Sequence, residues 1–413
     1  MRRRAAILLA LPLTLAATLL SASAAGSASA AGSEASAPAA ASAVEGGDAR
    51  TSRSAATRLY TPAPNPEAYT QIRDLMYQGR YADAAGLMAM VSTPQAVWYG
   101  DQTPAQVESD ARRVTLDAAR KGTLPVFALY NVPGRDCSNY SGGGASTTAE
   151  YQAWIDAVAR GIGDRPAMVV LEPDSLALLP SDCGQDDAQG TLTAARYTEV
   201  RHAVDTLEPL ARTRVYLDTG HPAWHSVRSI VPRLVRGGVA NATGFYTNAS
   251  NYQTDEANVR YGTLISACVA YVQGGGSAAD CPDQWTPRAE ADAWVARNAP
   301  ADPTRMKRFV TDSSRNGRGP WTPPAGVYPD PQDWCNPPDR GAGARPTTAT
   351  GEPLHDARLW IKTPGESDGL CLRGTPGPQD PARGMVDPRA GDWFREQALE
   401  LVRLANPPLI ARS

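Results

Sequence analysis

The sequence has no excess of basic residues and no paired-cysteine motif. Its 40 Lys and Arg against 43 Asp and Glu give a formal net charge of −3, and no basic stripe is visible, so nucleic acid is not expected as a partner. None of the six cysteines forms a CxxC pair, which argues against a zinc site built from thiolates. No GK[ST] motif follows the glycine run at 142–144, so this run does not predict a phosphate-binding loop.

Large apolar residues are scarce at the N-terminus outside one short run. Met1–Arg4 is basic, residues 5–20 are uncharged, and Ala22-Ser23-Ala24 and Ala28-Ser29-Ala30 are candidate cleavage sites. This pattern predicts a secretory signal peptide over residues 1–30, because the apolar core is short for a membrane span of about 20 residues. An uncleaved membrane anchor is the alternative reading, and the arginines leave both the general and the twin-arginine export routes open.

The composition changes twice along the chain. Residues 31–57 are dominated by Ala, Ser and Gly and cannot bury enough surface to offset their ordering entropy, so they are expected to form a disordered linker. From residue 58 the composition is globular. We expect residues 58–413 to form one domain, since about 350 residues is within the range of an α/β barrel.

Apolar, β-rich runs alternate with helical patterns. Seven runs are expected as strands: 96–100, 124–132, 167–171, 214–217, 242–247, 307–311 and 357–362. Helices are expected to begin after the N-cap residues Thr103 and Thr147 and over 194–210, 226–234, 256–272 and 393–405. The alternation implies a parallel sheet. It predicts an α/β fold, a distorted (β/α) TIM-like barrel with its active site at the carboxyl ends of about seven strands, in preference to an open doubly wound sheet.

A polar residue follows each expected strand: Asp101, Asp136, Asp174, Asp218, Asn248, Asp312 and Asp368. An aspartate after a strand is often only a helix N-cap, worth about 1 kcal/mol. That interpretation suits Asp101 and part of Asp174. It suits Asp136 and Asp368 poorly, since glycine-rich loops surround them. A ring of acids on one face of a barrel is therefore the better account.

Crowded carboxylates change one another's pKa, because like charges disfavour ionisation. A group that keeps its proton near neutral pH serves as a general acid, and an ionised partner serves as a base. Glycoside hydrolysis uses such a pair. Five aromatic residues that could stack on sugars lie at or near the same strand ends: Trp98, Tyr130, Trp224, Trp334 and Trp360.

Two long motifs resemble the signatures of glycoside hydrolase family 6, here of the secreted actinobacterial type. These are cellulases, endoglucanases and cellobiohydrolases, that cleave β-1,4-glucan with inversion. The motifs are VFALYNVPGRDC at 126–137, with the glycines after it, and MVVLEPDSL at 168–176. Four shorter blocks agree in order: YLDTGH at 216–221, DSSRNG at 312–317, WCNPP at 334–338 and WIKTPGESDG at 360–369. Asp339 and Thr219 depart from the pattern, which has glycine and more commonly alanine there.

The resemblance implies a role for each candidate residue. Asp174 would be the general acid, Asp136 would raise its pKa, and Asp368 would be the base, directly or through waters. Tyr130 would press the sugar toward a distorted ring. The glucose subsites would be lined by Trp98, Asp218, His221, Trp224, Asn248, Trp334, Lys362 and Glu366. Inversion requires carboxyl groups about 6.5–9.5 Å apart, and we predict that spacing between the acid and a direct base.

Six cysteines in an exported chain suggest disulfides, with fifteen possible connectivities from the sequence alone. The resemblance implies three pairs: Cys137–Cys183, Cys335–Cys371 and Cys268–Cys281. It further implies a secreted, extracellular, monomeric hydrolase of cellulose or related β-glucans, with no cofactor, no metal and no membrane contact once the signal is removed. Endo action is favoured over exo action, although the segments 270–298 and 369–393 are longer than a minimal endo-type chain needs.

Two rival functions come from other classes. The first is a metallohydrolase that uses His221 and His225, four residues apart. Pro222 between them and the total of four histidines argue against it. The second is a glycan-binding barrel without turnover, since a fold does not guarantee activity. The retained acids argue against that reading.

Overall fold

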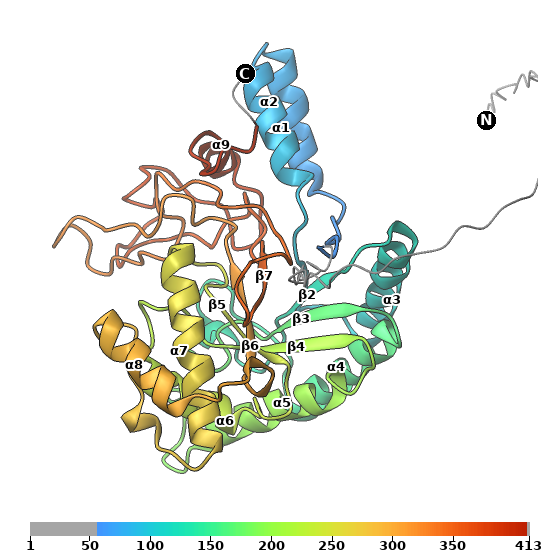
Figure 1. Cartoon of the computed structure of the whole chain (residues 1–413). Coiled ribbons are helices and arrows are strands. Elements are labelled where there is room, and N and C mark those ends of the chain that lie inside the picture. The colour runs from blue at the N-terminus through green and yellow to red at the C-terminus, as the bar shows by residue number, and fades with distance from the viewer. Residues whose placement is uncertain (1–55, 411–413) are drawn as a thin grey trace, which may run out of the picture. The chain divides into compact units, whose positions relative to one another are not determined.

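The structure is a computed structural model that describes residues 56–410. The predicted signal peptide and nearly all of the predicted linker lie outside the described residues. The sheet has seven parallel strands in chain order (Figure 1). They are β1 (Val97–Tyr99), β2 (Val126–Leu129), β3 (Ala167–Leu171), β4 (Thr213–Asp218), β5 (Gly244–Thr247), β6 (Arg308–Asp312) and β7 (His355–Leu359). Each lies within or beside one of the runs expected as strands.

The sheet curls into an incomplete barrel. β1 and β7 are the edges of the sheet, and single hydrogen bonds rather than a strand ladder connect them. The Ala96 N–H donates to the Trp360 carbonyl at 2.9 Å, and Trp98 Nε1 donates to the Ile361 carbonyl at 2.7 Å. The predicted distorted, seven-stranded barrel is therefore confirmed.

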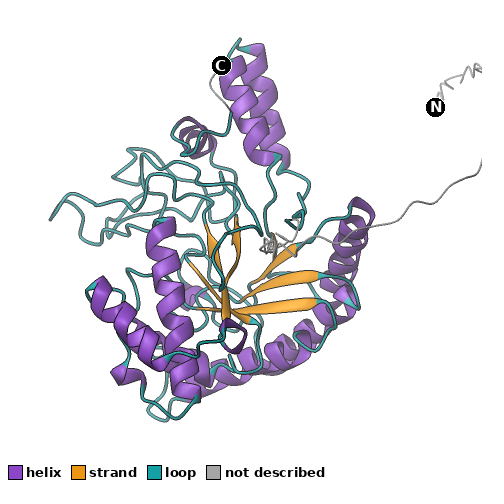
Figure 2. Ribbon diagram, in the orientation of Figure 1, coloured by secondary structure: helices purple, strands orange, loops and turns teal. Residues whose placement is uncertain are grey.

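Helices cover the outside of the sheet, except for the first two and the last, which pack together away from it (Figure 2). The described residues contain α1 (Pro66–Tyr77), α2 (Tyr81–Val91), α3 (Pro104–Lys121), α4 (Thr148–Ile162), α5 (Thr191–Leu207), α6 (Val227–Arg236), α7 (Asp255–Gln273), α8 (Arg288–Asn298) and α9 (Arg395–Arg403). The six predicted helices correspond to α3–α7 and α9. Thr103 and Thr147 accept the expected capping bonds. The sequence analysis missed α1, α2 and α8; α8 buries only Ala291 and so shows no apolar stripe.

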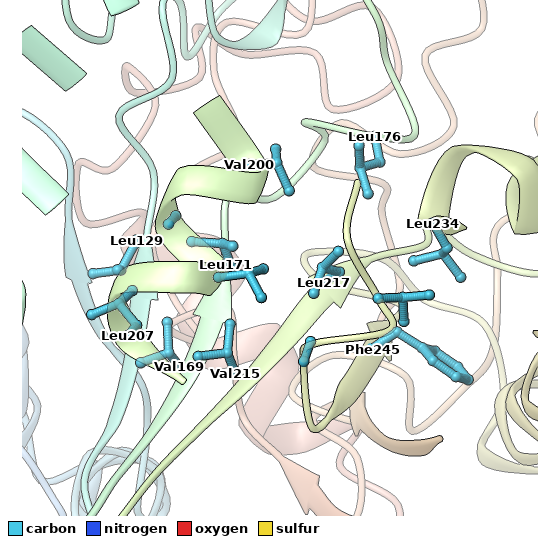
Figure 3. Close-up of a cluster of buried hydrophobic side chains, with 14 of the residues drawn as sticks. Leu129, Val169, Leu171, Leu176, Val200, Leu207, Val215, Leu217, Leu234 and Phe245 are labelled. Carbon is cyan, nitrogen blue, oxygen red and sulfur yellow. The ribbon is translucent and has the colours of Figure 1, made fainter. Parts of the chain in front are cut away.

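The strands alternate between two cores. Along β3, Val169 and Leu171 face the cluster shared with the helices, whereas Met168 and Val170 face the barrel interior. Figure 3 shows the outer cluster, where side chains of β2 to β5 pack with Val200 and Leu207 and with Leu234. Burial on both faces explains why these strands read as continuous apolar runs in the sequence.

Three disulfides hold loops at the edges of the barrel, and they are the three pairs that the resemblance implied. Cys137–Cys183 joins the loop after β2 to the loop after β3. Cys335–Cys371 joins the two long loops, 313–354 and 360–394, that follow β6 and β7. Cys268–Cys281 closes the segment at the end of α7. In the described part of the chain, no helix is both long and apolar enough to cross a membrane.

Candidate active site

The segment EPD, residues 172–174, sends its two acids to different partners. Glu172 and Asp174 both have positive φ, 51° and 67°, so the chain turns sharply after β3. Glu172 is fully buried, and its Oε2 accepts the N–H groups of Asn131 (2.7 Å) and Val132 (3.0 Å). These two bonds offset part of the cost of burying the carboxyl group, and burial raises the pKa of Glu172 to about 7. Glu172 therefore fixes the loop that begins at Tyr130, and Asp174 is left to face the site.

Asp174 meets Tyr130 and two other acids at the carboxyl side of the sheet. The Tyr130 hydroxyl donates to Asp174 Oδ2 at 3.2 Å. Burial, then the charges of Asp218 and Asp136, raise the pKa of Asp174 to about 8. The charge of Asp368 in turn helps to raise the pKa of Asp136, for which burial is the largest cause. The structure thus brings together the three acids to which the sequence assigned the chemistry.

Asp368 lies in the opposite electrostatic environment. Arg315 Nη1 lies 2.7 Å from its Oδ2, and Lys362 Nζ lies 3.2 Å from its Oδ1. Burial favours the neutral form, but these two cations more than offset it, so the pKa of Asp368 lies below its ordinary value. Asp174 keeps a proton at neutral pH and Asp368 is ionised, which is the division of roles that general acid and base catalysis uses.

Three residues around Asp368 were missed as site residues. Arg315 is fully buried and also lies over the Tyr252 ring, 4.5 Å from its centroid. The Tyr252 hydroxyl donates to Asp368 Oδ2 at 3.3 Å, and the Asn336 N–H donates to the same oxygen at 3.0 Å. Arg315 and Asn336 stand inside the motifs DSSRNG and WCNPP, and that position is the signal that could have marked them. Tyr252 carries no such signal.

Asp218 and Asn248, expected at glucose subsites, instead make hydrogen bonds to backbone groups of the protein. Asp218 is 2% exposed and accepts N–H groups from Leu176 (3.2 Å), Ala177 (2.8 Å) and Gly220 (2.9 Å). Asn248 is fully buried, and its Nδ2 donates to the Asp312 carbonyl at 2.8 Å. Neither side chain has a free face for a sugar, so both shape loops of the site.

Asp312, another acid of the expected ring, is also a backbone clamp. It is fully buried, and its oxygens accept four N–H groups, from Ser250, Ser314, Ile361 and Lys362, at 2.8–3.1 Å. It therefore ties the end of β6 to the end of β7. Asp101, interpreted as a helix cap, is instead an exposed partner of Arg135 at 2.9 Å, and Thr103 caps α3.

Asp136 sits in a tight turn beside a disulfide. Asp136, Cys137 and Ser138 all have positive φ, between 48° and 63°. Such backbone conformations are costly for residues other than glycine and persist only where the surroundings hold them. Here the Asp136 Oδ2 accepts the Ser141 N–H at 2.7 Å, and Cys137 is bonded to Cys183.

The remaining candidates for sugar contacts divide by exposure. Trp98 packs edge-on against Tyr130, with ring centroids 5.8 Å apart. Trp224 is 38% exposed and Trp334 is half-buried, so both offer ring surface to a ligand. Trp360, by contrast, is 1% exposed and belongs to the core. Lys362 Nζ also donates to the Ser367 carbonyl at 3.1 Å, and burial is the largest cause of the raised pKa of Glu366.

The two histidines of the metal hypothesis are engaged elsewhere. His225 Nε2 lies 2.6 Å from the Ala177 carbonyl, and burial lowers the pKa of His221 to about 3. Among residues 56–410, neither ring makes an ion pair with a carboxylate. One cluster in that range, Cys371, Asp380 and Asp387, has metal-ligand spacing. Cys371 is in a disulfide and Asp380 pairs with Arg373, so the cluster does not offer three free ligands.

Two cavities of about 780 and 770 Å³ lie away from these acids. The first is lined by the start of α7 and by residues 316–319. The second is lined by the first residues of β3 and β4. It therefore lies at the amino ends of the strands, opposite the acids. Neither changes the location of the candidate site.

The chain matches the family model described as "Glycosyl hydrolases family 6" over residues 54–405. Endoglucanase A of Cellulomonas fimi is 36% identical over 325 residues, which are 78% of this chain and 57% of that protein. Endoglucanase 1 of Streptomyces sp. (strain KSM-9) is 38% identical over 280 residues, 67% of this chain and 65% of that protein. The chain thus covers less than two thirds of each of these curated relatives.

A solved structure shows the same fold. It is the endoglucanase Cel6 of Mycobacterium tuberculosis in complex with methyl-cellobiosyl-4-deoxy-4-thio-β-D-cellobioside, 34% identical with a TM-score of 0.62. The match covers 85% of this chain and 98% of that one. The curled parallel sheet with acids at its carboxyl edge is the framework of a glycosyl hydrolase. The chain belongs to family 6 of the glycosyl hydrolases.

Glu172→Ala is expected to destabilise the protein by about 2–4 kcal/mol, because it leaves two buried N–H groups without an acceptor. Glu172→Gln keeps an acceptor oxygen and should cost less than half as much. Urea unfolding of both variants measures the difference. An unchanged unfolding midpoint for Glu172→Ala would show that the clamp on residues 131 and 132 contributes nothing.

Proposed function

We propose that this chain is a secreted, inverting glycoside hydrolase that cleaves β-1,4-glucosidic bonds in cellulose or a related β-glucan. Its family supports this, as do the two curated relatives and the solved structure, which are named endoglucanases. The single observation that carries the proposal is the pair of carboxyl groups with opposite protonation. The pKa of Asp174 is raised to about 8, whereas the pKa of Asp368 is lowered.

Asp174 is the proposed general acid that protonates the leaving glycosidic oxygen. Tyr130 donates its hydroxyl hydrogen to Asp174 Oδ2 at 3.2 Å. Tyr130 thereby orients the acid as well as standing where it can press on a sugar ring. Asp136 helps to keep Asp174 protonated through its charge, after the larger effect of burial.

Asp368 is the proposed base that activates the attacking water, directly or through a second water. Arg315 and Lys362 keep it ionised, so its oxygens can accept hydrogen bonds from a water and orient that water for attack. Inversion predicts a separation of about 6.5–9.5 Å between a direct base and the acid. We further propose that glucose units contact Trp98, His221, Trp224, Trp334, Lys362 and Glu366.

Endo action is the preferred mode, because the two curated relatives and the solved structure described above, 34–38% identical to this chain, are endoglucanases. Exo action by a cellobiohydrolase of the same family is the alternative. A glycan-binding barrel without turnover is disfavoured, since binding alone gives no reason to hold one acid protonated and another ionised.

The proposed organisation is a signal peptide at 1–30, a linker at 31–57 and a catalytic domain at 58–413, and the mature enzyme is proposed to be an extracellular monomer without membrane contact. The family match begins at residue 54, close to the proposed start of the domain. Three disulfides are typical of proteins that fold in an oxidising compartment.

Asp174→Asn is expected to lower kcat by about 10³-fold, because the amide cannot protonate the leaving oxygen. Binding of a cello-oligosaccharide, followed by calorimetry, should change little. Asp101→Asn is the matched control, since Asp101 follows β1 but is exposed, and among the described residues its side chain pairs with Arg135. Full hydrolysis by Asp174→Asn would rule out the assigned acid.

The rate should depend on pH through both carboxyl groups. As pH falls, protonation of Asp368 abolishes kcat/KM, and as pH rises above about 8, ionisation of Asp174 does the same. Arg315→Met removes a positive charge and should move the acidic limb to higher pH. Arg308→Met is the control. Arg308 stands at the start of β6, and the substitution breaks its ion pair with Asp356 of β7. An unmoved acidic limb in Arg315→Met contradicts the role of Asp368.

Endo action predicts a fast loss of viscosity of soluble carboxymethyl cellulose for each reducing end released, and inversion predicts an α-anomer as the first product. Viscometry tests the first expectation and NMR of cello-oligosaccharide digestion tests the second. Slow viscosity loss with steady cellobiose release would assign exo action. A first-formed β-anomer would contradict inversion.

A further inference from the structure

One residue contacts Asp368 at both its side chain and its backbone. The Asn336 N–H donates to Asp368 Oδ2 at 3.0 Å, and Asn336 Oδ1 accepts the Asp368 N–H at 2.8 Å. The other groups on this carboxylate, Arg315, Lys362 and Tyr252, contact its oxygens alone. The cations set the charge of Asp368, whereas Asn336 sets where its main chain lies.

We propose that Asn336 is the positioning residue of the base Asp368, and that Asp387 fixes the orientation of the Asn336 amide. The inference deepens the proposed function and rests on the role given there to Asp368.

The Asn336 amide has one orientation that satisfies its neighbours. Its Nδ2 faces three acceptors: Asp387 Oδ2 at 2.8 Å, Ser367 Oγ at 2.9 Å and the Gly369 carbonyl at 3.0 Å. Its Oδ1 also accepts from Gln397 Nε2 at 3.1 Å. Rotating the amide would place an oxygen against a carboxylate and a carbonyl, so these contacts hold the amide in place.

Asp387 is a buried carboxyl group that, among residues 56–410, accepts a side-chain hydrogen bond from this amide. It is 2% exposed, and its Oδ1 has no hydrogen-bond partner among the described residues. Burying a carboxyl group while one of its oxygens makes no hydrogen bond costs free energy. The hydrogen bond from the Asn336 amide to the other oxygen therefore offsets part of the cost of burying Asp387. Burial and the nearby charge of Asp380 raise the pKa of Asp387 to about 7.

The backbone at Asn336 is fixed as well as the side chain. Its φ of 38° is in the left-handed region, which Asn adopts more readily than most residues. The preceding residue, Cys335, is bonded to Cys371 in the loop that carries Asp368. The loops after β6 and β7 are therefore joined covalently next to the amide contacts.

Asn336→Asp tests the proposal because it keeps the size and the backbone preference but turns the donor toward Asp387 and Gly369 into an acceptor. We expect kcat to fall 10- to 100-fold with KM within twofold, and the acidic limb to move to higher pH, since a new carboxylate raises the pKa of Asp368. The double variant Asn336→Asp/Asp387→Asn reverses donor and acceptor. It should recover at least tenfold in kcat.

Asn258→Asp is the matched control, a buried amide on α7 whose Nδ2 donates to the Gln253 carbonyl at 2.8 Å. Its pH profile should not move. Wild-type kcat and an unmoved acidic limb in Asn336→Asp overturn the proposal. So does a loss of kcat that comes with a lower thermal midpoint, an unmoved limb and no recovery in the double variant.

Asp368→Ala distinguishes a failure of the proposed function from a failure of the positioning role of Asn336. An active Asp368→Ala variant contradicts the proposed function itself. An inactive Asp368→Ala variant beside an unaffected Asn336→Asp variant contradicts only the positioning role of Asn336.

Discussion

The buried ion pair between Arg315 and Asp368 is the interaction on which the site depends. A carboxylate at this depth would take up a proton if it stood alone, because burial disfavours its charge. Arg315 and Lys362 reverse that outcome, with contacts of 2.7 and 3.2 Å. Asp174, within reach of the same group of acids but without a cation in contact, keeps its proton. The opposite pKa shifts of these two carboxyl groups therefore come from a difference in their neighbours.

The acids at the strand ends divide into two kinds. Glu172, Asp218 and Asp312 are buried and accept two, three and four backbone N–H groups, so each fixes the loop that follows its own or a neighbouring strand. Asp174 and Asp368 are held by side chains and loops that these clamps arrange. Some acids of the ring therefore hold the loops that position the others. They can do so because backbone N–H groups beyond the strand ends lack a partner in the sheet and can donate to a carboxylate.

Two positions where the chain departs from the family pattern have a structural explanation. Asp339 has a φ of 60°, a conformation in which glycine is unstrained and aspartate is among the better tolerated alternatives. Thr219 donates its hydroxyl to the Tyr246 carbonyl at 2.6 Å, a bond between β4 and β5 that alanine cannot make. Neither change replaces Asp136, Asp174 or Asp368.

The sequence by itself determined the strands, the parallel barrel and the position of each acid at a strand end, because burial on two faces and the alternation with helices are local patterns. The tertiary structure alone decided which acids take backbone N–H groups and which face the site. Asp218 and Asp368 look alike in the sequence, yet one accepts three N–H groups and the other meets Arg315. The protonation of Asp368 depends on Arg315, which lies 53 residues away in the chain, and periodicity does not record such a neighbour.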